Sequence, residues 1–254
     1  MGLKLPGIVQ AFYWRCRRMG RVVDSWEDMD AAIAAEAPKS ICIVGNAGYL
    51  AELPQRETID SHDLVLRMNN CRLRGFEQHI GGKTDIYMSN FFHDIDFSNP
   101  AISEARYHIA SRPNSFRKSR RRTNGSRQIN FRYGAHIARG MVLGNIRRSF
   151  APSETQFIEW VDALGSEPTT GFAAIQLALT LPSIERIYVT GFSFFEGKSH
   201  YFSDQNIQPF HNIQDERTLL CSQLREEASR GRLTCDPVLS RQVGIKDDDF
   251  RIAV

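Results

Sequence analysis

Two histidines near the carboxyl end of the chain, eleven residues apart, lie in segments that could carry out proton transfer. His200 begins the sequence His-Tyr-Phe, and His211 begins His-Asn-Ile-Gln-Asp-Glu. The pKa of imidazole lies near neutrality, so a histidine can take a proton from a hydroxyl group or donate one to a departing group. A histidine taken alone is more often an ordinary surface or core residue. A catalytic interpretation therefore depends on what the rest of the chain places beside these two.

A short turn containing two glycines follows the first apolar segment. Residues 39–44 are mostly apolar and rich in isoleucine and valine, and Gly45-Asn46-Ala47-Gly48 comes directly after them. Open α/β sheets bind ligands at the carboxyl ends of their strands, and glycines let backbone N–H groups approach an anion closely. The same pattern also fits a plain strand-to-helix turn, and it lacks the third glycine of a dinucleotide-binding fingerprint.

A second candidate anion site lies at the start of an apolar helix pattern. Thr169 and Thr170 precede an apolar run over residues 171–181. Threonine is a good helix cap, and the free N–H groups of a first helical turn attract anions. A well-capped core helix without a ligand is the alternative. The strand pattern that follows this helix ends at Gly191-Phe192.

Strands that alternate with helices must position these segments. We expect strands over residues 39–44, 64–68, 85–88, 107–111 and 186–190, and helices over residues 22–35, 153–164, 171–181 and 215–230. Asp24-Ser25 is expected to cap the first of these helices. The alternation predicts an α/β fold, with one parallel sheet and helices on both faces, in a single domain. Along the chain we expect a basic amino-terminal segment with a helix (1–38), a catalytic domain (39–235) and a carboxyl-terminal tail (236–254), whose acidic stretch 247–249 is expected to be loose.

Four of these segments, in this order, resemble the motifs of the eukaryotic-type sialyltransferase family. Residues 40–90 are similar to the long motif, residues 168–192 to the small motif, His200-Tyr201-Phe202 to the third motif, and His211 with Glu216 to the very-small motif. The resemblance implies a Rossmann-like variant of the GT-A glycosyltransferase fold. It also implies an inverting transfer of sialic acid, or a related sugar, from a CMP-sugar donor to a hydroxyl of a glycan or glycolipid acceptor, without a metal or other cofactor.

The resemblance also implies a role for each matching residue. His211 would be the general base, His200 would bond the donor phosphate, and Glu216 would organise a helix start. Tyr201 would join His200 at the phosphate. The implied donor-binding residues are Gly45, Asn46, Gly48, Asn69, Thr169, Thr170, Gly171, Gly191, Phe192 and Tyr201. Arg67 and Asp60, within the long motif, are expected to be structural.

Three positions depart from the family pattern. Tyr49 stands where many members have an asparagine, and Ser203 stands where an acid is common. Cys42 lies near one position of the disulfide that joins two motifs in animal members, but the segment 182–184 offers no partner. These departures leave the exact sugar open. We expect a bacterial relative that acts on a cytoplasmic glycolipid or polysaccharide precursor.

The basic charge of the chain is concentrated in two stretches. Residues 112–127 contain seven lysines and arginines and no acid, and residues 1–22 contain five and no acid, whereas the net charge of the whole chain is only +3. We interpret residues 112–127 as a mobile loop that could act as a lid or could contact an acidic acceptor or an anionic membrane surface. Nucleic-acid binding is the alternative, disfavoured because aromatic residues are sparse there.

Other features bear on compartment and on competing functions. Five scattered cysteines without a CxxC pair favour a reducing compartment, and we expect neither a secretory signal nor a membrane-spanning helix. The protein is therefore expected to be cytoplasmic, with peripheral contact to the inner face of a membrane. Asp94-Ile95-Asp96 has the spacing of an Asp-x-Asp metal site, so a metal-dependent transferase remains an alternative. A nicotinamide-dependent oxidoreductase is disfavoured, and a non-catalytic nucleotide-sugar-binding protein remains an alternative.

Overall fold

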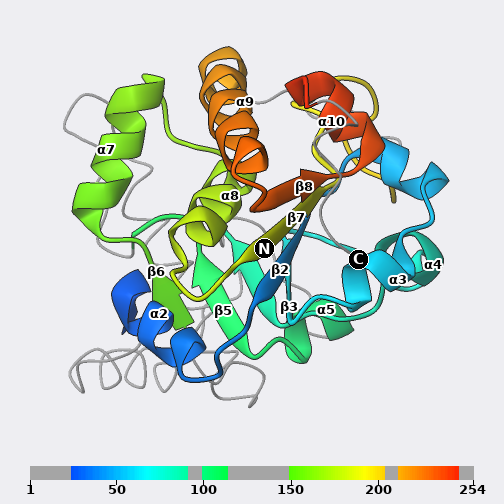
Figure 1. The fold of residues 1–254 in the computed structure, drawn as a ribbon, viewed down its shortest axis with the longest axis horizontal. Coiled ribbons are helices and arrows are strands. Elements are labelled where there is room, and N and C mark those ends of the chain that lie inside the picture. The colour runs from blue at the N-terminus through cyan, green and yellow to red at the C-terminus, as the bar shows by residue number, and fades with distance from the viewer. Residues whose placement is uncertain (1–23, 91–98, 114–148, 204–210, 246–254) are drawn as a thin grey trace, which may run out of the picture.

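One parallel sheet of eight strands forms the centre of the protein (Figure 1). The structure is a computed structural model that describes residues 24–90, 99–113, 149–203 and 211–245. The strand order is β1-β6-β5-β4-β3-β2-β7-β8, and every neighbouring pair is parallel. The strands are β1 (Asp24–Ser25), β2 (Ser40–Val44), β3 (Leu64–Met68), β4 (Ile86–Ser89), β5 (Tyr107–Ala110), β6 (Ser149–Ala151), β7 (Arg186–Thr190) and β8 (Leu233–Cys235).

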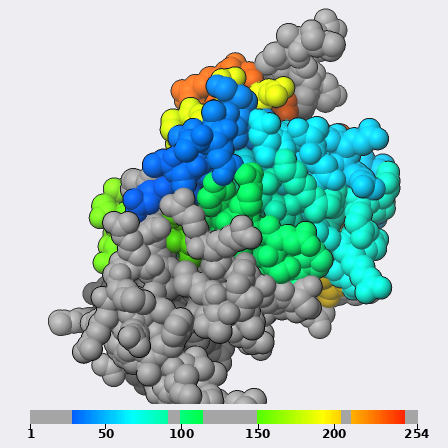
Figure 2. All heavy atoms as spheres, turned by 90° about the horizontal axis from the view of Figure 1, so that it is seen from below, coloured from blue at the N-terminus to red at the C-terminus, as the bar shows by residue number. Residues whose placement is uncertain are grey.

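Helices cover both faces of this sheet, and its central strands β2 and β3 are therefore buried along their whole length. One face carries α2 (Trp26–Ala34), α7 (Glu154–Leu164), α8 (Thr170–Thr180), α9 (Ile213–Ser229) and α10 (Pro237–Val243), which pack into one apolar cluster with the sheet. The other face carries the 3-10 helix η1 (Gly48–Glu52) and the helices α3 (Arg56–Asp60), α4 (Glu77–Ile80) and α5 (Pro100–Ser103). Figure 2, seen from below, shows the blue residues of the amino-terminal part of the described chain beside green and cyan surface that comes from later segments.

The predicted α/β fold with helices on both faces is confirmed. The strands expected over residues 64–68 and 186–190 coincide with β3 and β7, and the helix expected from residue 153 is α7, capped by Ser153. The start of the first helix was wrong. The helix begins at Trp26 rather than at residue 22, and Asp24 and Ser25 before it form β1, which pairs with β6 across more than a hundred residues of sequence. A two-residue strand is set by its distant partner and leaves no periodic pattern of its own.

The carboxyl-terminal boundary also differs from the expectation. Residues 237–243, expected within the carboxyl-terminal tail, form α10, and Leu239 and Val243 are buried in the main core. Asp236 caps this helix, since its Oδ1 accepts hydrogen bonds from the N–H groups of Val238 (2.8 Å) and Leu239 (2.9 Å). Asp-Pro is a recognisable helix start, so the sequence did contain a signal for α10.

Arg67 and Asp60 make the structural contacts expected of them. Arg67 is fully buried in β3 and donates to the carbonyl groups of Ile80 (2.6 Å) and Lys83 (2.9 Å). The Asp60 carboxylate accepts from the N–H groups of Gly82 and Lys83, each at 3.0 Å. Both side chains therefore fix the turn between α4 and β4.

Several sequence predictions concern residues outside the described ranges. They are the basic amino-terminal segment (1–23), the acidic pair at 94 and 96, all but the first two residues of the basic run 112–127, and the acidic tail from 246 onward. Within the described ranges, no helix is both long and apolar enough to cross a membrane.

Candidate active site

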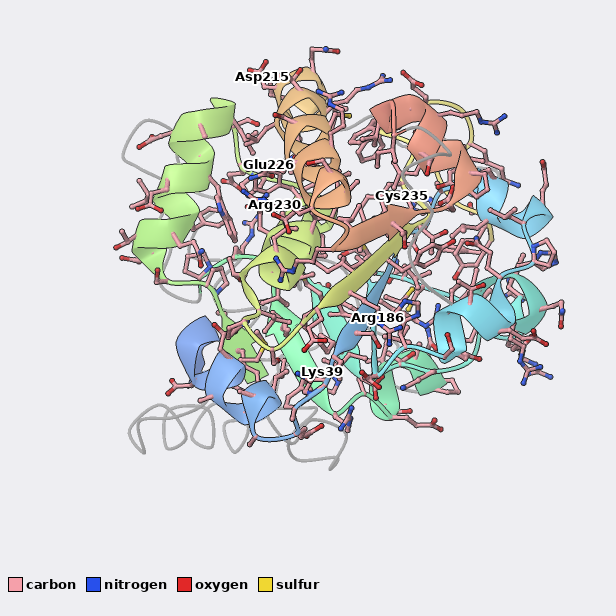
Figure 3. The ribbon with its side chains drawn as sticks, viewed as in Figure 1. Lys39, Arg186, Asp215, Glu226, Arg230 and Cys235 are labelled. Atoms are coloured by element: carbon pink, nitrogen blue, oxygen red, sulfur yellow. The ribbon has the colours of Figure 1, made fainter. Side chains whose placement is uncertain are left out.

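The sheet reverses its strand order between β2 and β7. From β2 the chain adds β3, β4, β5 and β6 on one side, and β7 and β8 on the other. Ligands of open α/β sheets bind at such a switch point, at the carboxyl ends of the strands. In Figure 3, Lys39 and Arg186 mark the entry to β2 and β7, and Cys235 marks the far end of β8. Asn46, Asn69 and Gly191 follow their strands at this far edge.

Gly45 allows a close approach of backbone to backbone at this edge. Its N–H donates to Thr190 O (2.8 Å), and a Cβ on Gly45 would lie 2.1 Å from Gly191 O. The N–H of Gly48 likewise donates to Lys198 O (2.9 Å). The N–H groups of Gly45 and Gly48 were expected to approach an anion; they donate instead to carbonyl groups of the protein. Gly45 lets the chain after β2 pack against Gly191 after β7, and Gly48 lets it pack against Lys198.

Two asparagines end neighbouring strands with unpaired oxygens. Asn46 Nδ2 donates to Met68 O (3.1 Å), which ties the end of β2 to the end of β3. Asn69 adopts a positive φ of 52°, a conformation that asparagine tolerates better than most residues. The Oδ1 atoms of Asn46 and Asn69 are buried and have no hydrogen-bond partner among the described residues. Since a buried unpaired acceptor costs about 1–3 kcal/mol, both oxygens are candidates to accept from a ligand.

Tyr201 brings the His200 segment to these asparagines. Its N–H donates to Asn46 O (3.0 Å), and its hydroxyl both donates to Arg72 O and accepts from Arg72 N, at 2.9 Å each. The single hydroxyl proton of Tyr201 is therefore used within the protein, whereas the sequence interpretation gave it to a donor phosphate. Burial lowers the pKa of the half-buried His200, so its imidazole is neutral near pH 7.

Glu216 connects α9 to the start of α8. Its Oε2 accepts from Thr169 N (3.0 Å), and its Oε1 accepts from the Thr169 hydroxyl. Thr169 Oγ1 in turn accepts from Phe172 N (3.0 Å), which is the helix-capping bond. Burial raises the pKa of Glu216, although the Thr169 bonds and the nearby His211 oppose that rise. Glu216 thus organises a helix start, as expected, but the start is that of α8.

The first turn of α8 keeps unpaired donors. Among the described residues, the N–H groups of Thr170 and Gly171 have no hydrogen-bond partner, and neither has the Thr170 hydroxyl. These groups stand at the positive end of an eleven-residue helix, where an anion is stabilised. The geometry therefore agrees with an anion site at Thr170 and Gly171, and not at Gly45 and Gly48.

His211 lies beside the residues that lead into α8. Its Nδ1 is 2.7 Å from Glu167 O. A carbonyl oxygen can only accept, so Nδ1 carries the proton and Nε2 of the neutral ring is left as a proton acceptor. The Glu167 carboxylate pairs with Arg112 (2.8 Å), the first residue of the basic run 112–127. His211 itself is half-buried.

The ring of Phe192 lies between the two halves of the site. A Cβ on Gly171 would lie 2.9 Å from Phe192 Cε1, and a Cβ on Gly45 would lie 3.1 Å from Phe192 Cδ2. The end of β2 and the start of α8 therefore face one another across this ring. Sequence analysis gave no role to Tyr49 or Asp236, which bond the Phe192 segment from the side of η1 and α10. The helix-cap pattern Asp-Pro was the sequence signal for Asp236. Tyr49 stood out only because many members of the family have an asparagine at this position.

The profile of glycosyltransferase family 29 (sialyltransferase) matches residues 25–228, which is most of the chain. The chain belongs to this family. The resemblance predicted from the four motifs is thereby confirmed, and the family 29 match spans all four of these motif segments.

Relatives of this family 29 chain carry names that differ in the sugar transferred. Sialyltransferase-like protein 2 of Oryza sativa subsp. indica is 36% identical over 90 residues, 35% of this chain and 22% of the relative. The type 2 lactosamine alpha-2,3-sialyltransferase of Homo sapiens is 27% identical over 206 residues, 72% of this chain and 61% of the relative. A beta-1,6-galactosyltransferase of Arabidopsis thaliana is 38% identical over 59 residues, 23% and 15% respectively. The chain thus spans less than two thirds of each of these relatives.

A solved family structure agrees with the fold. The crystal structure of a mammalian sialyltransferase superposes with a TM-score of 0.50 at 18% sequence identity, over 91% of this chain and 85% of that chain. At this identity the likeness supports the fold alone, and the predicted Rossmann-like architecture is confirmed.

Proposed function

We propose that this family 29 protein transfers sialic acid, or a related sugar, from a CMP-sugar donor to a hydroxyl group of a glycan acceptor. The observation that carries the proposal is that acceptors and donors with no partner in the described ranges meet at one edge of the sheet. The acceptors are the Oδ1 atoms of Asn46 and Asn69, and the donors are the first N–H groups of α8. A nucleotide has the complementary pattern, since its ribose and base donate hydrogen bonds and its phosphate accepts them.

The donor nucleotide would lie along this edge of the sheet. In our proposal the Asn46 and Asn69 oxygens accept from ribose hydroxyls or from the exocyclic amino group of cytosine. The phosphate accepts from the N–H groups of Thr170 and Gly171 and from the Thr170 hydroxyl, where the helix dipole favours its charge. Phe192, which lies between these groups, offers an aromatic surface to the base.

His211 would act as the general base of an inverting displacement. Its unprotonated Nε2 takes the proton of the acceptor hydroxyl while that oxygen bonds to the anomeric carbon of the sugar. The bond from the anomeric carbon to the phosphate oxygen breaks at the same time, and cytidine monophosphate leaves with the bonding electrons. A neutral His200 can donate an N–H hydrogen bond to the leaving phosphate, which reduces the cost of its added charge.

Calorimetric titration with cytidine monophosphate, in the presence of a chelator, tests this proposal. Adenosine and uridine monophosphates serve as controls for the base, and CMP-sialic acid with a panel of glycans then tests transfer. We expect selective binding of the cytidine nucleotide without metal, followed by turnover. No binding, or binding only with a divalent metal, would contradict the donor assignment. Selective binding without turnover of any CMP-sugar would favour a non-catalytic nucleotide-sugar-binding protein.

A further inference from the structure

Tyr49 has a hydroxyl group that uses its full hydrogen-bonding capacity on the Phe192 segment and on Asp236. The hydroxyl donates to Asp236 Oδ2 (2.7 Å) and accepts from Gly191 N (2.9 Å) and Phe192 N (3.1 Å). A phenol has one proton and two lone pairs, so these three bonds use its donor and both of its acceptor positions. Burial, and then the charge of Asp236, raise the pKa of Tyr49 well above its ordinary value, so the hydroxyl keeps its proton.

Asp236 is a fully buried carboxylate at the junction of β8 and α10. Its Oδ1 takes the two N–H groups at the start of α10. Its Oδ2 takes the Tyr49 hydroxyl and Gly191 N (3.2 Å). Four donors on one carboxylate compensate the loss of water around the buried charge. Through these bonds the start of α10 is joined to the end of β7.

The Phe192 peptide depends on this pair for its position. Among the described residues, the Tyr49 hydroxyl is the one acceptor for Phe192 N. Gly191, directly before it, has a φ of 79°, a left-handed conformation that residues with a side chain rarely adopt, so the chain turns sharply there. A shift of this peptide would move the Phe192 ring, which touches the positions of both Gly45 and Gly171.

We propose that Tyr49 and Asp236 are positioning residues of the donor site, which hold the Gly191-Phe192 peptide so that the Phe192 ring lies between Gly45 and Gly171. This inference rests on the proposed function, because the ligand that benefits is the donor nucleotide. It makes η1 and the start of α10 part of the support of the site, through the bonds of Tyr49 and Asp236 to the Gly191-Phe192 peptide. The residues it assigns are 187 positions apart in the sequence.

The substitution Tyr49→Phe tests the inference with a matched control. It removes one oxygen atom and leaves Phe192 N without its acceptor. We expect the Kd for cytidine monophosphate to rise about tenfold, which corresponds to the loss of one buried hydrogen bond. Tyr188→Phe is the control, because Tyr188 is a buried tyrosine of β7 whose hydroxyl bonds Gln55 Oε1 (2.5 Å) instead. Its Kd should stay within about twofold of the unsubstituted protein.

A double-mutant cycle separates positioning from general damage. If Tyr49 acts through the Phe192 ring, Tyr49→Phe added to Phe192→Ala should change the Kd by less than about twofold. Additive effects of the two substitutions would overturn the inference, and so would an unchanged Kd in Tyr49→Phe alone. Asp236→Asn keeps Oδ1 as the helix cap but replaces the second acceptor, so it should reproduce the effect of Tyr49→Phe.

Amide hydrogen exchange gives a readout that needs no nucleotide. The Phe192 amide should exchange faster in Tyr49→Phe than in Tyr188→Phe, with both compared to the unsubstituted protein. Equal exchange of this amide in the two variants would overturn the positioning role. Failure of the unsubstituted protein to bind any cytidine nucleotide would instead overturn the proposed function, even where the exchange result shows that Tyr49 fixes the peptide.

Discussion

At the scale of single residues, the position of one proton decides what His211 can do. The 2.7 Å contact from its Nδ1 to Glu167 O fixes the tautomer, and the other ring nitrogen is then free to act as a base. The two asparagines are suited to binding instead, since each has a buried oxygen that accepts no hydrogen bond from the described residues. Proton transfer and nucleotide binding are thereby assigned to different side chains, and substitution can separate them.

His211→Ala should remove transfer and leave nucleotide binding nearly intact. The base is lost, and loss of a positioned general base typically lowers the rate by about 10²–10⁴-fold. Asn69→Ala is the comparison, since it removes a candidate binding oxygen and should raise the Kd for cytidine monophosphate several-fold. Titration calorimetry measures the Kd of each variant, and a sugar-transfer assay measures the rate. Equal loss of binding in both variants would contradict the division of roles.

At the scale of elements, two contacts hold the site in shape. The end of β2 meets the end of β7 where a Cβ on Gly45 would lie 2.1 Å from a backbone oxygen. The start of α8 is fixed to α9 by the two hydrogen bonds from Thr169 to Glu216. Each contact joins segments that are far apart in the sequence, so damage to either should be visible as a loss of stability.

Gly45→Ala should destabilise the fold by about 3 kcal/mol, because the added methyl group meets a backbone atom that cannot rotate away. Gly82→Ala is the matched control, since a Cβ there has no neighbour within 4 Å and its φ is not positive. Its effect should stay within about 0.5 kcal/mol. Chemical denaturation measures both free energies of unfolding. Similar losses in the two variants would show that the contact between Gly45 and Gly191 is less tight than described.

Thr169→Val should lower the free energy of unfolding by about 2 kcal/mol, because Phe172 N loses its cap and the buried Glu216 loses a donor. The substitution keeps the shape of the side chain. Thr180→Val is the control in the same helix, where the hydroxyl is exposed to solvent and bonds Leu177 O (2.9 Å) within α8 itself. If Thr169→Val lost no more free energy of unfolding than the control, Glu216 would not be needed to fix the start of α8.

At the scale of the whole molecule, a buried histidine links the fold to pH. His108, fully buried in β5, bonds Ile102 O at 2.8 Å through Nε2, and burial lowers its pKa from 6.5 to about 4. Between these two values the unfolded chain binds more protons than the folded chain. Stability is therefore fully present above pH 6.5 and decreases as the pH falls toward 4. The shift corresponds to about 3 kcal/mol at most.

His108→Gln should flatten this dependence. Glutamine can still donate to Ile102 O but does not titrate, so the difference in the free energy of unfolding between pH 7 and pH 4.5 should become smaller. Some dependence should remain, because burial also lowers the pKa of His62 and His200. Glu216, whose pKa is raised, contributes with the opposite sign. An unchanged pH profile in the variant would show that His108 is not the group responsible.

The basic segments of the chain give a prediction for the intact protein. The full chain should sediment with vesicles that contain anionic lipids at low salt and be released as the salt concentration rises, because such attraction is screened. Neutral vesicles and oligonucleotides are the controls. Salt-dependent binding to oligonucleotides but not to vesicles would favour the nucleic-acid alternative. Peripheral contact with the cytoplasmic face of a membrane, and a bacterial origin, stay predictions from the sequence.

The sequence by itself determined the features that neighbouring residues encode. Apolar runs fixed β3 and β7, threonine and serine caps fixed the starts of α7 and α8, and four ordered segments placed the chain in its family. Such features depend on local periodicity and capping, so they can be read without a fold. The edge strands β1 and β8 could not be predicted this way, because three residues or fewer form a strand only against a partner.

The tertiary structure alone decided which polar groups are paired. It showed that the Gly45 and Gly48 amides are already bonded, that the first amides of α8 have no acceptor in the described part of the chain, and that Tyr201 uses its proton on Arg72. It also brought Tyr49 to Asp236 across most of the chain. A hydrogen bond depends on distance and direction between atoms, and folding sets both by joining residues whose separation in sequence carries no trace of the contact.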